Sequence, residues 1–172
     1  PRAVFERIRA EQPEVFYRMV GNVARRLSMR LKAANEHLVS GRSPVVASWR
    51  KEHDRLGERE LPDTAYYGVQ TLRGMENFPI SGIPLHHFSH FVRSLAYVKK
   101  AAALTNKDLA VILPARADAI ITACDEIIAG KWHQHFTIDM IQGGAGTPTN
   151  MNANEVIANR ALEILGHRKG QY

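Results

Sequence analysis

The feature that most constrains this chain is the helical spacing of its apolar residues from Pro84 onward. Three stretches repeat apolar residues every three or four positions, and residues that start or stop helices bound them. We predict helices over residues 84–106, from Pro114 to Gly130, and from about residues 147–150 to Gly166. The side chains expected to face inward are Leu85, Phe88, Phe91, Val92, Leu95, residues 98–102, Ile120, Ile121, Cys124, Ile127, Ile128, Val156, Ile157, Ala161, Leu162 and Leu165. The sequence therefore predicts a mainly α-helical fold with a thin core that needs further apolar surface.

Residues 50–84 show a different pattern, because glycine and proline interrupt the segment repeatedly. Good strand formers lie between these breaks, namely Tyr66, Tyr67, Val69, Phe78 and Ile80. We therefore predict loops with a short β-hairpin in this segment.

The region before residue 50 predicts one long amphipathic helix. Pro13 suits a first helical turn, and a heptad-like apolar stripe follows over residues 13–40. Its members are Phe16, Val20, Val23, Leu27, Leu31, Ala34 and Leu38. Gly41 and Pro44 end the pattern, so we expect a helix within residues 1–40, a linker over 41–49 and a domain over 50–172.

The charge is distributed unevenly between these parts. Residues 1–51 hold 11 Lys and Arg against 4 Asp and Glu, whereas residues 52–172 hold 12 Lys and Arg against 13 Asp and Glu. A basic helix can bind nucleic acid or an acidic partner, or can simply present a solvated face. We favour the solvated face and regard nucleic-acid binding as unlikely to be its role.

Several classes of protein are not supported by the sequence. No apolar run approaches the roughly 18 residues that a membrane span needs, and the charged N-terminus does not resemble a signal peptide. Cys124, the single cysteine, fits a helix core in a reducing, cytoplasmic setting. His86 and His90 are spaced to bind a metal but lack acidic or cysteine neighbours, so we expect a surface cluster and no metal. Since the sequence does not start with Met, we expect a fragment or a processed piece.

The run GGAGTPTNMNANEV, from Gly143, is the segment that suggests chemistry. Its glycines allow positive φ and close approach of the backbone to a ligand. Thr147 can cap the helix that follows, and Pro148 suits that helix's first position. A glycine-rich loop that leads into a helix N-terminus gathers N–H donors at the positive end of the helix dipole. The segment can therefore bind an anion such as a carboxylate, although a helix cap without a ligand is the commoner outcome.

This run resembles the first conserved block of the aspartase/fumarase superfamily. The upstream segments RLGERELPDTAYYGVQTLRGMENFPISG, VKKAAALTNKDL and ACDEIIAGK are similar to other blocks of that superfamily, in the same order, over about 120 residues. Ala145 favours aspartases, since fumarases usually carry serine at this place. A fumarase or another lyase of the superfamily remains the alternative.

The resemblance implies the N-terminal helical domain of an enzyme that converts L-aspartate reversibly to fumarate and ammonia without an organic cofactor. It implies that Thr147 contacts substrate, that Ala145 and Gly146 line the same loop, and that Asn150 orders the loop or reaches the ligand. Arg73 matches an arginine that supplies positive charge, or it forms a structural ion pair. The resemblance further implies a homotetramer whose catalytic residues lie beyond Tyr172, so we expect this chain alone to be inactive.

Residues 1–40 carry a separate resemblance. The stretch FERIRAEQPEVFYRMVGNVARRLSMRLKAANEHL is similar to the final helices of cyclic-nucleotide-binding domains, which often dimerise. No nucleotide site is implied, because the β-roll of those domains has no counterpart here. The alternatives are a plain coiled-coil helix and a regulatory or oligomerisation module built on the basic helix.

Overall fold

A computed structural model describes residues 2–17, 20–21 and 48–171. The chain divides into two units, residues 1–46 and 47–172, which we describe separately. In the first unit, helix α1 spans Arg2–Glu11, and residues 13–17 and 20–21 are also helical. Most of the predicted stripe over residues 13–40 lies outside the described residues. The predicted linker over residues 41–49 ends too late, because Trp49 already begins a strand.

The second unit begins with a β-hairpin formed by β1 (Trp49–Asp54) and β2 (Gly57–Pro62). The strands are antiparallel, with Trp49 opposite Pro62 and Asp54 opposite Gly57. A hairpin was expected, but its predicted position around Tyr66 to Ile80 was wrong. The strands are instead rich in charged residues on both faces. Lys51 and Glu58 are exposed, whereas the side chains of Arg50, Glu52 and Asp54 are 10%, 2% and 10% exposed. Because Leu61 is the buried apolar residue of the strands, there is little apolar alternation to detect.

A helix that the sequence did not predict follows the hairpin. Helix α3 spans Val69–Asn77, so Val69 belongs to a helix and not to a strand. Its first turn is held by acidic side chains from elsewhere. Glu155 accepts the Gly68, Gln70 and Thr71 N–H groups at 2.9, 2.7 and 3.0 Å and the Thr71 hydroxyl at 2.6 Å. Glu52 accepts the Val69 N–H at 2.9 Å. Carboxylates at a helix N-terminus satisfy its unpaired N–H groups and oppose its dipole.

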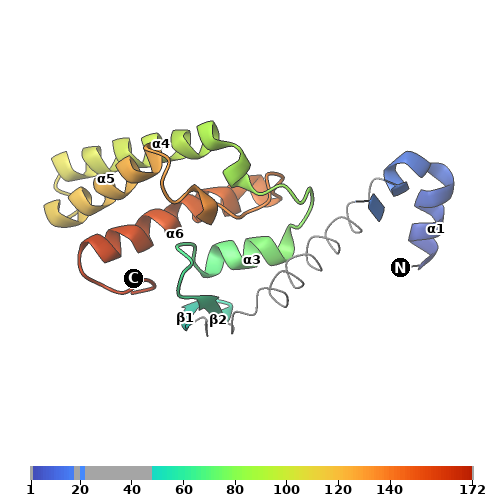
Figure 1. Cartoon of the computed structure of the whole chain (residues 1–172), viewed down its shortest axis with the longest axis horizontal. Helices are drawn as coiled ribbons and strands as arrows, with labels where there is room; N and C mark the ends of the chain where they lie inside the picture. Colours follow the sequence, from blue (N-terminus) through green and yellow to red (C-terminus); the bar gives the residue numbers. More distant parts are fainter. Residues whose placement is uncertain (1, 18–19, 22–47, 172) are drawn as a thin grey trace, which may run out of the picture. The chain divides into compact units, whose positions relative to one another are not determined.

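Three longer helices complete the unit (Figure 1). Helix α4 spans Ser89–Asp108, α5 spans Pro114–Ile128, and α6 spans Thr147–Ile164. Short 3₁₀ turns at Leu85–His87 and His133–His135 precede α4 and follow α5. The predicted mainly helical fold is confirmed, and the predicted boundaries of α5 and α6 agree with the structure to within two residues.

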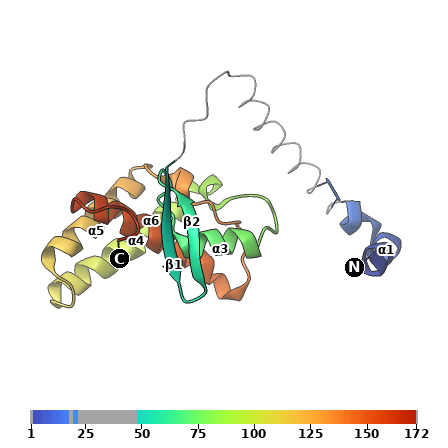
Figure 2. The ribbon, with the colours of Figure 1, turned by 90° about the horizontal axis from the view of Figure 1, so that it is seen from below.

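Helix α6 lies between the α4–α5 pair and α3, and the hairpin lies beside α3 (Figures 1 and 2). The core gathers side chains from all these elements. Its largest fully buried members are Phe136, Leu61, Ile127, Ile138, Val92 and Val156. Cys124 lies in this core as predicted, and burial raises the pKa of its thiol to about 12.

Part of the predicted inward face of α4 was wrong. Phe91 and Val98 are 47% and 64% exposed, whereas Val92, Ala96 and Ala103 face the core. Two of the three buried residues of α4 are alanines, whereas Phe91, Tyr97, Val98 and Leu104 are exposed. Within the described ranges, none of the helices combines the length and apolarity that crossing a bilayer requires.

Candidate functional site

The loop that enters α6 is anchored at Asp139, which is 7% exposed. Its carboxylate accepts the Ser81 N–H and hydroxyl at 2.8 and 2.6 Å, the Gly82 N–H at 2.7 Å and the Ile141 N–H at 2.9 Å. Burial alone raises the pKa of this carboxyl, but the hydrogen bonds outweigh burial and hold the pKa below its usual value. The start of the loop is therefore fixed to the segment before α4.

The backbone then turns through three consecutive left-handed residues. Gly144, Ala145 and Gly146 have φ values of 64°, 57° and 76° and form a single 3₁₀ turn. Gly143 packs so closely on the Phe78 ring that an added Cβ would lie 2.6 Å from it. The glycines of this run are thus required by conformation and by close packing.

The N-terminus of α6 emerges directly from this turn. The cap residue is Gly146, which has no side chain with which to cap the helix. The expectation that Thr147 caps the helix was wrong, because Thr147 is already its first residue and Pro148 its second. Thr147 is exposed, and its N–H donates to the Gly144 carbonyl. The start of α3 is bound by the Glu155 carboxylate, whereas the residue that caps α6 is a glycine.

Asn150 lies three residues after Thr147 and is also exposed. Residues three apart lie on the same face of a helix, so these two side chains are neighbours on the first turns of α6. The Asn150 Oδ1 accepts a hydrogen bond of 2.6 Å from the Lys99 ammonium of α4. Lys99 also borders a mostly apolar hollow of about 250 Å³ between α4, α5 and α6.

Arg73 has a different environment from the other predicted site residues. It is 9% exposed, and its Nε and Nη2 each lie 2.7 Å from an Asp54 carboxylate oxygen. Its Nη2 also donates to the Gly57 carbonyl at 2.9 Å. The hydrogen bonds from Arg73 lower the pKa of Asp54. The structure therefore brings Ala145, Gly146, Thr147 and Asn150 together, whereas the Arg73 guanidinium is engaged with the hairpin.

The chain is similar to a known family of enzymes. A family model described as "Lyase" matches residues 57–171, which is more than half of the chain. The chain belongs to this lyase family. The superfamily resemblance seen in the sequence is thereby confirmed.

Individual proteins are similar to this chain over the same region. The chain is 56% identical to an aspartate ammonia-lyase of Pseudomonas canavaninivorans over 127 residues and to one of Bacillus subtilis over 124 residues. These matches cover 74% and 72% of this chain but 27% and 26% of the relatives, in their N-terminal part. The chain therefore spans about a quarter of the length of these curated relatives.

Two solved structures of related enzymes are also similar to most of this chain. A fumarate lyase from Brucella melitensis, crystallised with cobalt, is 54% identical with a TM-score of 0.72, covering 73% of this chain and 27% of that one. A class II fumarase from Schistosoma mansoni is 37% identical with a TM-score of 0.64, covering 72% and 26%.

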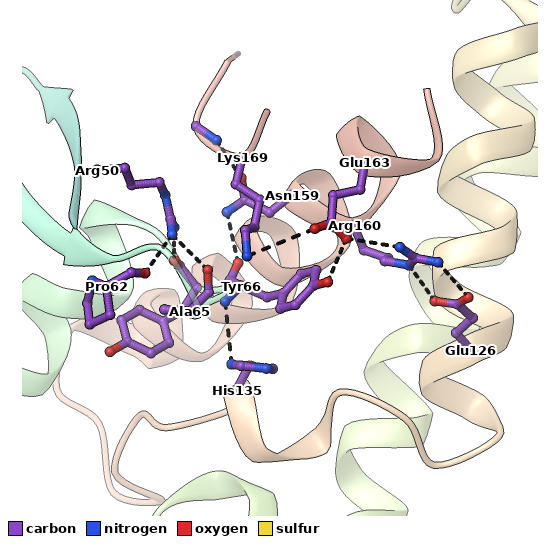
Figure 3. Close-up of polar contacts among 12 residues, drawn as sticks. Arg50, Pro62, Ala65, Tyr66, Glu126, His135, Asn159, Arg160, Glu163 and Lys169 are labelled. Atoms are coloured by element: carbon purple, nitrogen blue, oxygen red, sulfur yellow. Dashed lines mark hydrogen bonds and ion pairs between the residues drawn. The ribbon is translucent and has the colours of Figure 1, made fainter. Parts of the chain in front are cut away.

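Towards the C-terminal end of α6, the lyase chain contains a partly buried polar network (Figure 3). Arg160 bridges Glu126 of α5, at 2.6 and 2.9 Å, and Glu163, at 2.9 Å. The Tyr66 hydroxyl donates to Glu163 at 2.5 Å, and the Asn159 amide donates to the Tyr66 carbonyl at 2.8 Å. Burial and the Glu163 hydrogen bond raise the pKa of Tyr66 to about 12. Since these groups bond to one another, the network joins α6 to α5 and to the segment after β2.

His135 lies at the edge of the same network. Its Nδ1 accepts the Tyr66 N–H at 3.4 Å, and the centre of its ring lies 4.9 Å from that of the Tyr66 ring, with the two planes tilted by 56°. Burial, reinforced by the nearby Lys169 ammonium, lowers the pKa of His135 to about 4. The imidazole is therefore neutral near pH 7 and acts as a hydrogen-bond acceptor. No local pattern of residues marks this role, because the Tyr66 contact spans 69 positions.

The other described histidines show no arrangement for metal binding. The rings of His86 and His87 are in contact, with centres 4.7 Å apart and planes tilted by 40°, and burial lowers the pKa of His86. Across residues 2–17, 20–21 and 48–171, no three His, Cys, Asp or Glu side chains are grouped to hold a metal ion.

Proposed function

We propose that this chain provides the substrate-carboxylate loop of an aspartate ammonia-lyase. The observation that carries the proposal is the α6 N-terminus, which follows a left-handed turn and is capped by a glycine, Gly146. Its dipole and the Thr147 hydroxyl suit a carboxylate of L-aspartate or fumarate. The identity of 56% to aspartate ammonia-lyases, against 37% to the class II fumarase, favours aspartate over malate as the substrate.

In the proposed reaction, a base removes a proton from the carbon next to the β-carboxylate of L-aspartate. The resulting enediolate-like dianion collapses and expels ammonia, leaving fumarate. Donors fixed before the reaction stabilise the charge that develops on the carboxylate, and such stabilisation is usually the largest catalytic contribution. Ala145 and Gly146 shape the proposed cradle, Thr147 donates to the carboxylate, and Asn150 supports it from the next turn.

We leave Arg73 out of this contact set, because its guanidinium is already bound by Asp54 and Gly57. We place the catalytic base in the part of the relatives' length that this chain does not cover. The complete enzyme is proposed to be a cytoplasmic homotetramer without an organic cofactor. Cyclic-nucleotide regulation and dimerisation through residues 1–40 stay predictions, since that segment lies largely outside the described residues.

A chimera tests the proposal directly. Residues 50–171 would replace the matching N-terminal quarter of the Bacillus subtilis aspartate ammonia-lyase, and fumarate formation would be followed by ultraviolet absorbance. We expect an active chimera, and Thr147→Val in it should lower kcat/KM about 100-fold, as removal of one donor to a developing oxyanion does. Thr122→Val is the matched control, because the exposed Thr122 hydroxyl only donates to Asp118 of its own helix. Equal activity of the Thr147→Val and parent chimeras would refute the proposal.

The isolated chain provides a second test. With L-aspartate it should form no fumarate above the buffer rate, because the proposed base is missing. Turnover by the isolated chain would show that the base lies within its own residues.

A further inference from the structure

Three lysines of α4 make different contacts, although they lie on one helix. Lys100 and Lys107 form ion pairs with Asp125 and Asp118 of α5. Lys99 instead donates to the neutral Asn150 amide at 2.6 Å. Its ammonium is therefore directed to Asn150, the fourth residue of α6.

The chemistry of the two groups fixes the orientation of the Asn150 amide. An ammonium has only donors, so the atom it contacts must be the amide oxygen. The Asn150 NH₂ group then lies on the other branch of the planar amide and retains both of its donors. Without Lys99, the amide could turn over and present its oxygen, which would repel a carboxylate.

The position of Asn150 places its NH₂ group where it can donate to a ligand. Asn150 and Thr147 share one face of α6, so the NH₂ group and the Thr147 hydroxyl are two donors one helical turn apart. The charge of Lys99 also adds to the positive end of the α6 dipole. Both effects favour a carboxylate at this face.

We propose that Lys99 is a positioning residue, which holds the Asn150 amide so that its NH₂ group donates to a carboxylate bound at the α6 N-terminus. This inference rests on the proposed function, because it concerns the same anion site. It assigns Lys99 an action through Asn150 and no contact with substrate.

The test is an NMR titration of the whole chain with succinate, an unreactive dicarboxylate. Three variants are compared with the parent: Lys99→Met, which keeps the length but removes the donors, Lys99→Arg, which restores a cationic donor, and Lys100→Met as a control on the same helix. The signals followed are the amides of Gly146, Thr147 and Thr149 and the side-chain NH₂ of Asn150. Urea unfolding of each variant checks that the fold is retained.

In the parent, all these signals should shift with succinate. Lys99→Met should move the Asn150 NH₂ signal before succinate is added, abolish its response, and weaken binding about tenfold, the value of one charge-assisted hydrogen bond. Lys99→Arg should restore binding to within about threefold, and Lys100→Met should bind like the parent. The threefold margin reflects the different geometry of the two cations.

The two possible failures are distinct. A response of the loop amides that is unchanged in Lys99→Met would overturn the role of Lys99 and leave the proposed anion site intact. No response of any followed signal in the parent would overturn the anion site, and the inference with it.

Discussion

Glu155 offers the sharpest test of how this fold is held together. Its side chain leaves α6 and is 5% exposed, and its two oxygens accept four hydrogen bonds at the start of α3. Three of the donors are backbone N–H groups, which α3 cannot satisfy internally. We predict that Glu155→Ala strongly destabilises the chain and that Glu155→Gln does so to a smaller extent.

The magnitude follows from the groups left without partners. Each buried N–H without an acceptor costs about 1–3 kcal/mol, and loss of a charge at a helix N-terminus costs about 0.3–1 kcal/mol. Water that enters beside the shorter Ala side chain recovers part of this, so we expect a loss of about 3–5 kcal/mol for Glu155→Ala. In Glu155→Gln one oxygen remains, but the amide NH₂ would face an N–H donor, so a loss of about 2–3 kcal/mol follows.

The measurement is urea unfolding followed by far-ultraviolet circular dichroism at pH 7. Glu58→Gln is the control, since that side chain lies on β2, is 69% exposed and forms only a 3.5 Å ion pair with Lys51; its effect should stay below about 0.5 kcal/mol. A loss below about 1 kcal/mol in Glu155→Ala, within the range of an ordinary substitution, would show that the carboxylate is not what holds α3.

Three further outcomes are expected in the same unfolding assay. Gly146→Ala should lower the free energy of unfolding by about 1 kcal/mol, because φ is +76° at this residue, although an added Cβ would meet nothing within 4 Å. An unchanged urea midpoint would argue against the left-handed turn. Gly74→Ala should lower the free energy of unfolding by about 1–3 kcal/mol, because the new Cβ would lie 2.5 Å from Ile138 Cδ1 and 3.1 Å from Pro148 Cβ. An unchanged free energy of unfolding would contradict this contact. Since the pKa of His135 falls from 6.5 to about 4 on folding, the unfolded chain takes up the proton first, and stability should fall as the pH drops from about 6.5 towards 4. His135→Gln should flatten that dependence, and an unaltered pH profile would exclude His135 as its source.

The parts of the fold that the sequence predicted are those with local signals. Pro114 and Gly130 mark the limits of α5 without reference to any other segment, and the glycines before Thr147 likewise identify the loop. Helix α3 had no such signal, because the groups that hold its start include Glu155, 84 to 87 positions away. Propensity alone favoured a strand for Val69, and a tertiary contact outweighed it.

The residues of the candidate site likewise divide into those with a local sequence signal and those that depend on distant contacts. Thr147 and Asn150 could be found from the glycine-rich run, because a helix N-terminus is a local feature. The partner of Arg73 could not, since a guanidinium suits a substrate carboxylate as well as Asp54, and only the packing of the hairpin on α3 decides between them. The contact of Lys99 with Asn150 likewise depends on how α4 lies against α6.

The buried polar residues of α6 hold this helix, and the loop that leads into it, in a fixed position. Asn152, Glu155 and Asn159 follow one another at steps of three and four, and all are buried. Each bonds to the backbone of a different segment: Asn152 to the His135 carbonyl, Glu155 to the start of α3, and Asn159 to the Tyr66 carbonyl. A polar stripe in a helix interior is costly unless every group is paired, and here the partners belong to three separate segments of the same unit. The stripe therefore fixes α6 relative to its neighbours, so the N–H groups at its start are already in place for the proposed anion. Donors that need no reorganisation are the kind that stabilise a developing carboxylate charge best.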